Sequence, residues 1–210
     1  KVRKKYILDT SCIILAGGKG LRLGRDKVLE TIGHRSLLEQ VISCVSLICT
    51  DISIVITQER VIPKFTSHLN TRILTDTYPG KGPLAGIHAG LIASNSLYNL
   101  VVASDMPFLN QDLLRYMIEL ATEFDMVVPL VDNLVEPLHA IYSKNCLVPI
   151  EDMLKQDNLS VYQLLNSVKV RYVETGEIER FDPEHLSFFN INTKADLDKA
   201  RGLAKRECEQ

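Results

Sequence analysis

Short apolar runs alternate along the chain with longer stretches in which apolar residues recur every three or four positions. The runs are rich in β-branched residues, which predicts buried strands. These strands cover residues 12–15, 51–57, 72–75, 99–104, 126–131 and 137–142. The helical spacing predicts helices at residues 37–45, 84–94 and 110–121. Strands alternating with helices at short spacing predict an α/β fold, a three-layer α/β/α Rossmann-like sandwich with a mainly parallel sheet.

The pattern after residue 145 is less regular. It predicts helices at about 147–155 and 160–168, strands at 170–174 and 188–191, and a closing helix from Lys194. Three helix starts carry suitable first residues: Ser36 and Asn110 as N-caps, and Pro83 in a first turn. The sequence has no internal repeat, low-complexity tract or linker, so we predict a single domain over residues 1–210.

The stretch from Cys12 to Lys27, CIILAGGKGLRLGRDK, joins the first predicted strand to a glycine-rich loop. Glycines permit sharp turns and let a ligand approach backbone N–H groups closely. Four cations lie within nine residues of this loop: Lys19, Arg22, Arg25 and Lys27. Since the whole chain has a net charge of −2, this local excess predicts a polyphosphate site. The alternative interpretation is a strand-to-helix turn with solvated basic residues.

Two familiar phosphate loops do not fit this stretch. The P-loop requires Ser or Thr after its Gly-Lys pair, and no Gly-Lys pair here is followed by either. The dinucleotide fingerprint requires Gly or Ala where Leu23 stands. Residues 80–85, GKGPLA, fit a looser form of that fingerprint, but residues 77–79 separate them from the preceding strand. We interpret that second match as chance.

Composition narrows the functional classes. The net charge of −2 argues against a general binder of nucleic acids or anionic membranes. No apolar run approaches the roughly 20 residues that span a bilayer, and the basic start leads into a short strand instead of a signal-peptide core. The five cysteines include no C-x-x-C pair. They indicate reduced thiols in a cytoplasmic protein and no zinc site.

Two aspartates follow predicted strands: Asp76 ends the third and Asp105 the fourth. Because parallel strands end at a common edge where ligands bind, both should converge with the glycine-rich loop. Asp105 suits Mg²⁺, which takes one or two carboxylates beside nucleotide phosphates. The structural alternatives are that Asp105 caps the next helix, a role Asn110 already fills, and that Asp76 forms an Asx turn.

Residues 15–27 fit L-A-G-G-x-G-x-R-x-G-x-D-K, which resembles the signature of nucleotide-sugar-type nucleotidyltransferases. Within that group the chain looks most like the molybdenum cofactor guanylyltransferases (the MobA family). Later family landmarks follow in order: G-P-L-A-G at 82–86, E-P-L-H at 136–139 and N-I-N-T at 190–193. The resemblance implies a GT-A-like fold with a nucleotide-binding part at about 11–108 and an acceptor-binding part at about 109–210.

The resemblance implies transfer of GMP from Mg-GTP to the phosphate of molybdenum-molybdopterin, giving molybdopterin guanine dinucleotide cofactor and pyrophosphate. The substrates would be GTP and molybdopterin carrying molybdenum, and molybdoenzyme-maturation proteins would be partners. Since the acceptor phosphate is already anionic, catalysis should rest on positioning and charge neutralisation instead of a strong base. The expected catalytic residues are Arg22, Lys27 and Asp105, with Asp105 as the Mg²⁺ ligand. The alternative for the two cations is a solvated surface.

The resemblance also assigns binding residues. They are Leu15, Ala16, Gly17, Gly18, Lys27, Asp76, Gly82, Asp105, Asn190 and Asn192. The first three would present backbone groups to guanine and ribose. Asn190 and Asn192, two positions apart on the strand predicted at 188–191 and just beyond it, would face a pterin together. Alternatively, Asn192 or Thr193 caps the final helix. Glu136 or His139 would lie near the second substrate, whereas His88 is expected to be a packed histidine.

The chain departs from the family pattern at residues 57–59, Thr-Gln-Glu, where members commonly carry a nucleotide-contacting Asn. That contact is either absent or made by Gln58. Two other functions stay open. One is a CTP-using molybdopterin cytidylyltransferase or another phospho-acceptor transferase, against which G-P-L-A-G together with N-I-N-T argues. The other is a non-catalytic nucleotide-binding regulator, against which the retained Arg22, Lys27 and Asp105 argue.

Overall fold

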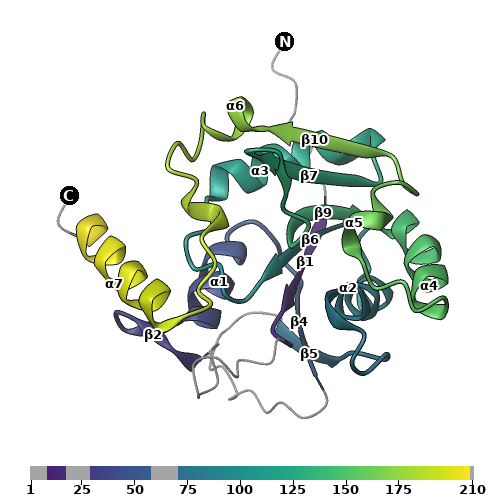
Figure 1. Cartoon of the computed structure of the whole chain (residues 1–210), viewed down its shortest axis with the longest axis horizontal. Helices are drawn as coiled ribbons and strands as arrows, with labels where there is room; N and C mark the ends of the chain where they lie inside the picture. Colours follow the sequence, from purple (N-terminus) through teal and green to yellow (C-terminus); the bar gives the residue numbers. More distant parts are fainter. Residues whose placement is uncertain (1–8, 18–28, 58–70, 209–210) are drawn as a thin grey trace.

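A computed structural model describes residues 9–17, 29–57 and 71–208 (Figure 1). Within these residues, eight strands form one sheet, in the order β10-β7-β9-β6-β1-β4-β5 with β8 paired to β7. The strands are β1 (Thr10–Leu15), β4 (Ile52–Ile56), β5 (Thr71–Thr75), β6 (Tyr98–Ala103), β7 (Met126–Val131), β8 (Leu134–Val135), β9 (His139–Ser143) and β10 (Val170–Glu174).

The sheet is mainly parallel, as the sequence predicts. β1 pairs in parallel with both β4 and β6, β4 with β5, and β7 with β10. β9 runs antiparallel to its two neighbours, β6 and β7. The start of β9 therefore lies at the same edge as the carboxyl ends of the parallel strands. This reversal brings a segment of the C-terminal half to the edge where ligands bind in such sheets.

Helices cover both faces of the sheet, which confirms the three-layer prediction (Figure 1). Alternate residues of β1 point to opposite faces. Ile14 packs with α1 (Leu37–Val45) and α3 (Gln111–Glu119), whereas Ile13 packs with α2 (Gly82–Ala93), α4 (Leu147–Lys155) and α5 (Val161–Leu164). β1 is buried on both faces because it lies inside the sheet, between β6 and β4, with helices packed on each face, and this explains its continuous apolar run.

Three predicted helix starts are confirmed. The Ser36 hydroxyl accepts the Glu39 N–H at 3.3 Å, and the Glu39 carboxylate accepts the Ser36 N–H at 2.7 Å, which completes a capping box. Asn110 Oδ1 accepts the Leu113 N–H at 2.9 Å. Pro83 stands in the first turn of α2. The final helix, α7 (Lys194–Cys208), begins after Thr193, whose hydroxyl accepts the Asp196 N–H at 3.2 Å.

The strand predicted at 188–191 is wrong. The segment forms the 3-10 turn η4 (Leu186–Phe188) and then an irregular stretch. Local turn bonds explain the difference, because the N–H groups of Phe188 and Phe189 donate to the carbonyls of His185 and Leu186 at 3.1 and 3.0 Å. The buried carboxylate of Asp182 holds this turn by accepting the N–H groups of Leu186 and Ser187 at 3.0 and 2.7 Å. The helix predicted to reach residue 168 is also shorter, since α5 ends at Leu164.

The remaining elements are short and do not follow from the sequence pattern. They are η2 (Leu120–Glu123), η3 (Lys144–Cys146), α6 (Thr175–Ile178) and the hairpin of β2 (Thr31–Ile32) and β3 (Arg35–Ser36). Ile32 of this hairpin packs with Leu197 and Ala200 of α7 in a small separate apolar cluster. Across the three described ranges, the structure contains no helix with both the length and the apolar character needed to span a bilayer.

Candidate active site

The strand order reverses direction at β1. From β1 the chain proceeds outward to β4 and β5, and it then returns to β6 on the other side of β1. The chain therefore leaves β1 toward one edge of the sheet and leaves β6 toward the other, and such a reversal of strand order marks the switch point where open α/β sheets bind ligands. Ala16 and Gly17 follow β1, and Ser104 and Asp105 follow β6. The predicted convergence of these segments on one edge is therefore observed.

Backbone hydrogen bonds fix the end of β1. The Ala16 N–H donates to the Val55 carbonyl at 2.9 Å, and the Leu15 carbonyl accepts the Ser104 N–H at 3.0 Å. Ala16 is buried, and a Cβ on Gly17 would lie 3.2 Å from the Thr57 Cγ2. The space between Gly17 and Thr57 is too tight for a Cβ unless the Thr57 side chain shifts. This favours a glycine at position 17.

Asp105 is half-buried at the end of β6, above the buried Met106. Its carbonyl accepts the Ile191 N–H at 3.0 Å. This bond places residues 190–192 beside Asp105. The two segments are therefore close together, although residues 188–191 do not form the predicted strand. The shared face predicted for Asn190 and Asn192 rests on that strand, which residues 188–191 do not form. Asn190 Nδ2 donates to the Phe188 carbonyl at 3.2 Å, and the exposed Asn192 donates its N–H to Asp196 Oδ2 at 3.0 Å.

Asp76 is buried after β5, and its N–H donates to the Ile56 carbonyl at 3.2 Å. Among the described residues, Oδ1 of its carboxylate has no hydrogen-bond partner. Burial raises the pKa of this carboxyl above its usual range. A buried, unpartnered carboxylate oxygen suits a donor group or a cation supplied by a ligand, since leaving it unmatched costs free energy.

Residues 76–82 form a turn between Asp76 and the start of α2. Gly80 and Gly82 have positive φ angles of 79° and 67°, which disfavour other residues at these positions. Gly86, within the G-P-L-A-G element, serves packing instead, because a Cβ there would lie 2.9 Å from Leu15 Cδ2. Gly86 thus lets α2 pack closely against the end of β1, whereas Gly82 lies exposed at the loop.

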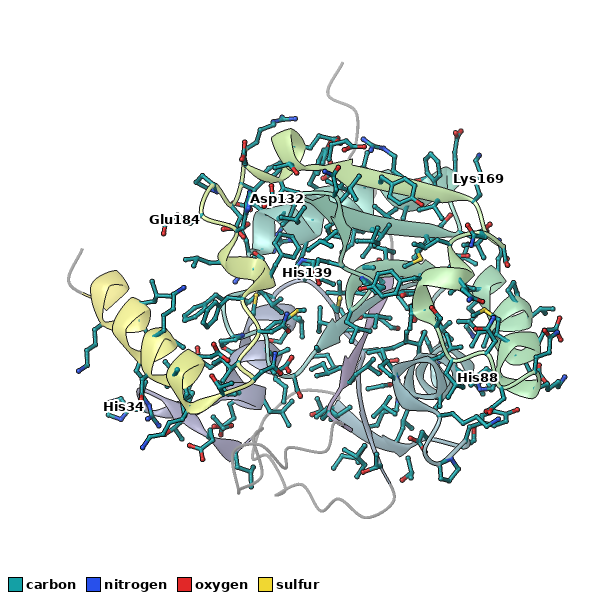
Figure 2. The ribbon with its side chains drawn as sticks, in the orientation of Figure 1. His34, His88, Asp132, His139, Lys169 and Glu184 are labelled. Carbon is teal, nitrogen blue, oxygen red and sulfur yellow. The ribbon has the colours of Figure 1, made fainter. Side chains whose placement is uncertain are left out.

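The two candidate histidines are packed in the interior. His139, at the centre of Figure 2, is fully buried, and its ring lies 4.8 Å from that of Phe188. Burial lowers the pKa of His139 to about 4, so the imidazole is neutral near neutral pH. His88 is buried against Tyr78, with 5.4 Å between ring centroids, and burial also lowers its pKa. Burial raises the pKa of the Glu136 carboxyl, which lies just before β9.

Gly18, Arg22, Lys27 and Gln58 lie outside the described residues. Within the described ranges, no group of three or more His, Cys, Asp or Glu side chains could hold a metal ion. Mg²⁺ bound with a nucleotide needs only one or two carboxylates and takes its other ligands from phosphates and water, and the half-buried Asp105 carboxylate suits such an ion.

Residues 12–171 match the family model of the MobA-like NTP transferase domain. The chain belongs to this family. It is 34% identical over 199 residues to the "Probable molybdenum cofactor guanylyltransferase" of Pelotomaculum thermopropionicum, with 95% of both chains covered. It is 35% identical over 195 residues to the molybdenum cofactor guanylyltransferase of Desulfosudis oleivorans, with 92% of this chain and 95% of that one covered. The predicted resemblance to the MobA family is thus confirmed.

Solved structures agree with this membership in the MobA-like family. The molybdopterin-guanine dinucleotide biosynthesis protein A of Archaeoglobus fulgidus superposes with a TM-score of 0.80 at 29% identity, covering 94% of this chain and 99% of that one. The 2-C-methyl-D-erythritol 4-phosphate cytidylyltransferase of Thermus thermophilus gives a TM-score of 0.70 at 18% identity, covering 94% and 100%. The second likeness concerns the fold alone, and it places the chain among folds that nucleotidyltransferases use.

Proposed function

We propose that this protein transfers GMP from GTP to the terminal phosphate of molybdopterin carrying molybdenum. An oxygen of the acceptor phosphate attacks the α-phosphorus of GTP, the bond from that phosphorus to the bridging oxygen breaks, and pyrophosphate leaves. The observation that carries the proposal is the meeting of two segments at the switch point. Asp105, from the nucleotide-binding half, is hydrogen-bonded through its carbonyl to Ile191, from the half expected to bind the acceptor.

Asp105 is the proposed Mg²⁺ ligand, and the surrounding chemistry fits that ion. The Asp105 carboxylate is half-buried just after β6. The buried oxygen of Asp76, which lacks a partner among described residues, follows β5 three strands away along the same edge and suits a group of the nucleotide instead. Bound Mg²⁺ would neutralise negative charge on the phosphates. Arg22 and Lys27 are proposed to add positive charge around the departing pyrophosphate.

The remaining contacts are proposals of the same kind. Backbone groups of Leu15, Ala16 and Gly17 would bind guanine and ribose, with Gly18 and Lys27 beside the phosphates. Asp76 and Gly82 would line the nucleotide site, and Asn190 and Asn192 the acceptor site. The fixed backbone at the end of β1 supports this arrangement, because a pre-positioned set of N–H and carbonyl groups reduces the entropy lost on binding.

Pyrophosphate release tests the proposal directly. Purified protein is assayed with molybdopterin-loaded acceptor and Mg²⁺, comparing GTP, CTP and ATP at equal concentrations. Release with GTP alone is the expected result. Release with CTP would make the protein a cytidylyltransferase on the same fold. Nucleotide binding without release from any of the three would support the non-catalytic regulator and contradict the proposed reaction.

A further inference from the structure

Lys81 stands between Gly80 and Gly82 in the loop at residues 76–82, within the loose fingerprint match that we interpret as chance. The structure directs its side chain toward α4. Its Nζ donates to the carbonyl of Leu154 at 2.9 Å and forms an ion pair with Asp157 Oδ1 at 3.1 Å. Leu154 stands in the last turn of α4, 73 residues after Lys81 in the sequence, and Asp157 follows the end of that helix. The side chain is 30% exposed.

The end of α4 is a suitable place for a cation. The helix closes with the Asn158 N–H donating to the Met153 carbonyl at 2.9 Å, and Asp157 adopts a left-handed conformation with φ 58°. The last carbonyls of a helix carry partial negative charge, which an ammonium group stabilises. Because Lys81 meets both a helix carbonyl and a carboxylate, two acceptors hold its head group in one place.

The other end of the connection is the turn that begins at Asp76. Gly80 and Gly82, on either side of Lys81, leave the backbone with many accessible conformations when no contact restrains it. Three interactions restrain this turn, two of them close to Lys81 in the sequence. The Lys81 N–H donates to the Tyr78 carbonyl at 3.2 Å, and Tyr78 packs on His88 of α2 (Figure 2 labels His88). The Lys81 side chain then ties the turn to α4.

We propose that Lys81 is a positioning residue that orders the loop from Asp76 to Gly82 for nucleotide binding without contacting the nucleotide. This proposal rests on the proposed function, since that loop is expected to contact GTP. Without the tether, GTP must order the loop itself, which weakens binding of the nucleotide. The chemical step should be unaffected once the nucleotide is bound, because the ordered loop makes the same contacts with the nucleotide with or without the tether.

The test compares Lys81→Met with wild type. Methionine keeps an unbranched side chain and removes the ammonium group. We expect KM and Kd for GTP to rise about tenfold, the factor that corresponds to 1.4 kcal/mol, with kcat and KM for the molybdopterin acceptor unchanged. Hydrogen exchange should become faster in a peptide that covers residues 76–84. Lys81→Arg, which keeps the charge, should restore most of the affinity for GTP.

Lys155→Met is the matched control. Lys155 also lies at the end of α4, but its ion pair joins it to Glu151 of the same helix at 2.9 Å. That variant should bind GTP like wild type. An unchanged KM in Lys81→Met would overturn the tether. A lower kcat at unchanged KM would overturn it too, because it would indicate contact with phosphate in the transition state.

Failure of the proposed function gives a different pattern. In that case wild-type protein would release no pyrophosphate with GTP, whatever the state of Lys81. The hydrogen-exchange comparison of residues 76–84 does not depend on turnover and still decides whether Lys81 orders the loop. Equal exchange in wild type and Lys81→Met would refute the positioning role, and faster exchange in Lys81→Met alone would support it.

Discussion

Two aspartates at the carboxyl edge of the sheet show how burial separates residues that look alike in the sequence. Asp76 is buried, with an unpartnered Oδ1 among described residues and a raised pKa. Asp105 is half-buried and held through its own carbonyl to Ile191. Since Asp105 follows β6, a strand beside β1, whereas Asp76 follows β5 at the end of the sheet, Asp105 is the better candidate for a ligand of the metal that accompanies the phosphates.

Asp105→Asn should lower kcat at least about 100-fold, because the amide keeps the shape of the side chain but loses the charge that holds Mg²⁺. Pyrophosphate release over a range of Mg²⁺ concentrations measures this effect. The fold should persist, with an unchanged far-UV circular dichroism spectrum. Asp112→Asn, on the exposed side of α3, is the control and should retain wild-type turnover. Full activity of Asp105→Asn with an unchanged Mg²⁺ requirement would refute the assignment.

His139 should make stability depend on pH. Its pKa is lowered from 6.5 to about 4 by burial, against the opposing charge of Asp182. The unfolded chain therefore binds a proton between pH 6.5 and 4 that the folded protein does not. Stability falls as pH decreases through this window, and the contribution of this one group is about 3 kcal/mol at full effect.

Urea unfolding of wild type and His139→Leu at pH 7 and at pH 4.5 tests this prediction. His139→Leu should lose much less stability than wild type between these two pH values, because no imidazole remains to be protonated on unfolding. The matched variant His34→Leu changes an exposed histidine in the β2–β3 turn, at the edge of Figure 2, and should follow wild type. An equal loss of stability in His139→Leu and wild type would contradict the assignment to His139.

Among the elements, α2 is set apart by how closely it lies on the sheet. Eight consecutive residues of this helix are buried, so its sequence has no polar face, in contrast to α1 and α3. Glycines at positions 86 and 90 permit the close approach, and the nearest atoms to a Cβ at Gly90 would be those of Ile13 at 2.5 to 2.8 Å. The helix therefore fixes the loop at its N-terminus to the end of β1.

Gly90→Ala should destabilise the protein by about 1–2 kcal/mol, because overpacking against the fully buried Ile13 exceeds the gain in helix propensity of up to about 1 kcal/mol. Gly202→Ala is the matched variant, since it lies in α7 with nothing within 4 Å of the added Cβ. That substitution should stabilise by up to about 1 kcal/mol. Urea denaturation measures both. Equal effects of the two substitutions would show that the fit of α2 on β1 is not tight.

For the whole molecule, the organising feature is a sheet shared by both halves of the chain. β6 lies between β1 of the nucleotide-binding half and β9 of the half expected to bind the acceptor. Ile191 and Lys81 add connections between the halves through the Asp105 carbonyl and the end of α4. The two halves therefore share one hydrophobic core on each face of the sheet.

We accordingly predict that residues 1–210 unfold as one cooperative unit. Urea transitions followed by far-UV circular dichroism and by the near-UV signals of the buried Tyr98 and Tyr142 should coincide. Limited proteolysis should produce no stable fragment that ends near residue 108. Two separate transitions, or such a fragment, would instead show that the halves are independent folding units.

The sequence alone determined the order and type of the main elements and the residues that follow each strand. Periodicity works for β1, α1 and α3 because burial on one or both faces dictates which positions are apolar. It failed at residues 188–191, where an apolar pair resembles a strand. There the N–H groups of Phe188 and Phe189, which a strand would need, donate to carbonyls of the preceding turn, His185 and Leu186. The family signature at residues 15–27 is equally local, because it consists of residue types at fixed spacing and requires no knowledge of contacts.

Only the tertiary structure decided which of these residues meet. The antiparallel direction of β9, the bond from Ile191 to the Asp105 carbonyl and the tie from Lys81 to α4 join segments far apart along the chain. No local pattern encodes such contacts, because propensity and spacing report on neighbours within a turn or a strand. Lys81 shows the consequence: its local sequence gives no sign of a contact with α4, whereas the packing of α4 beside the loop gives its ammonium group two acceptors.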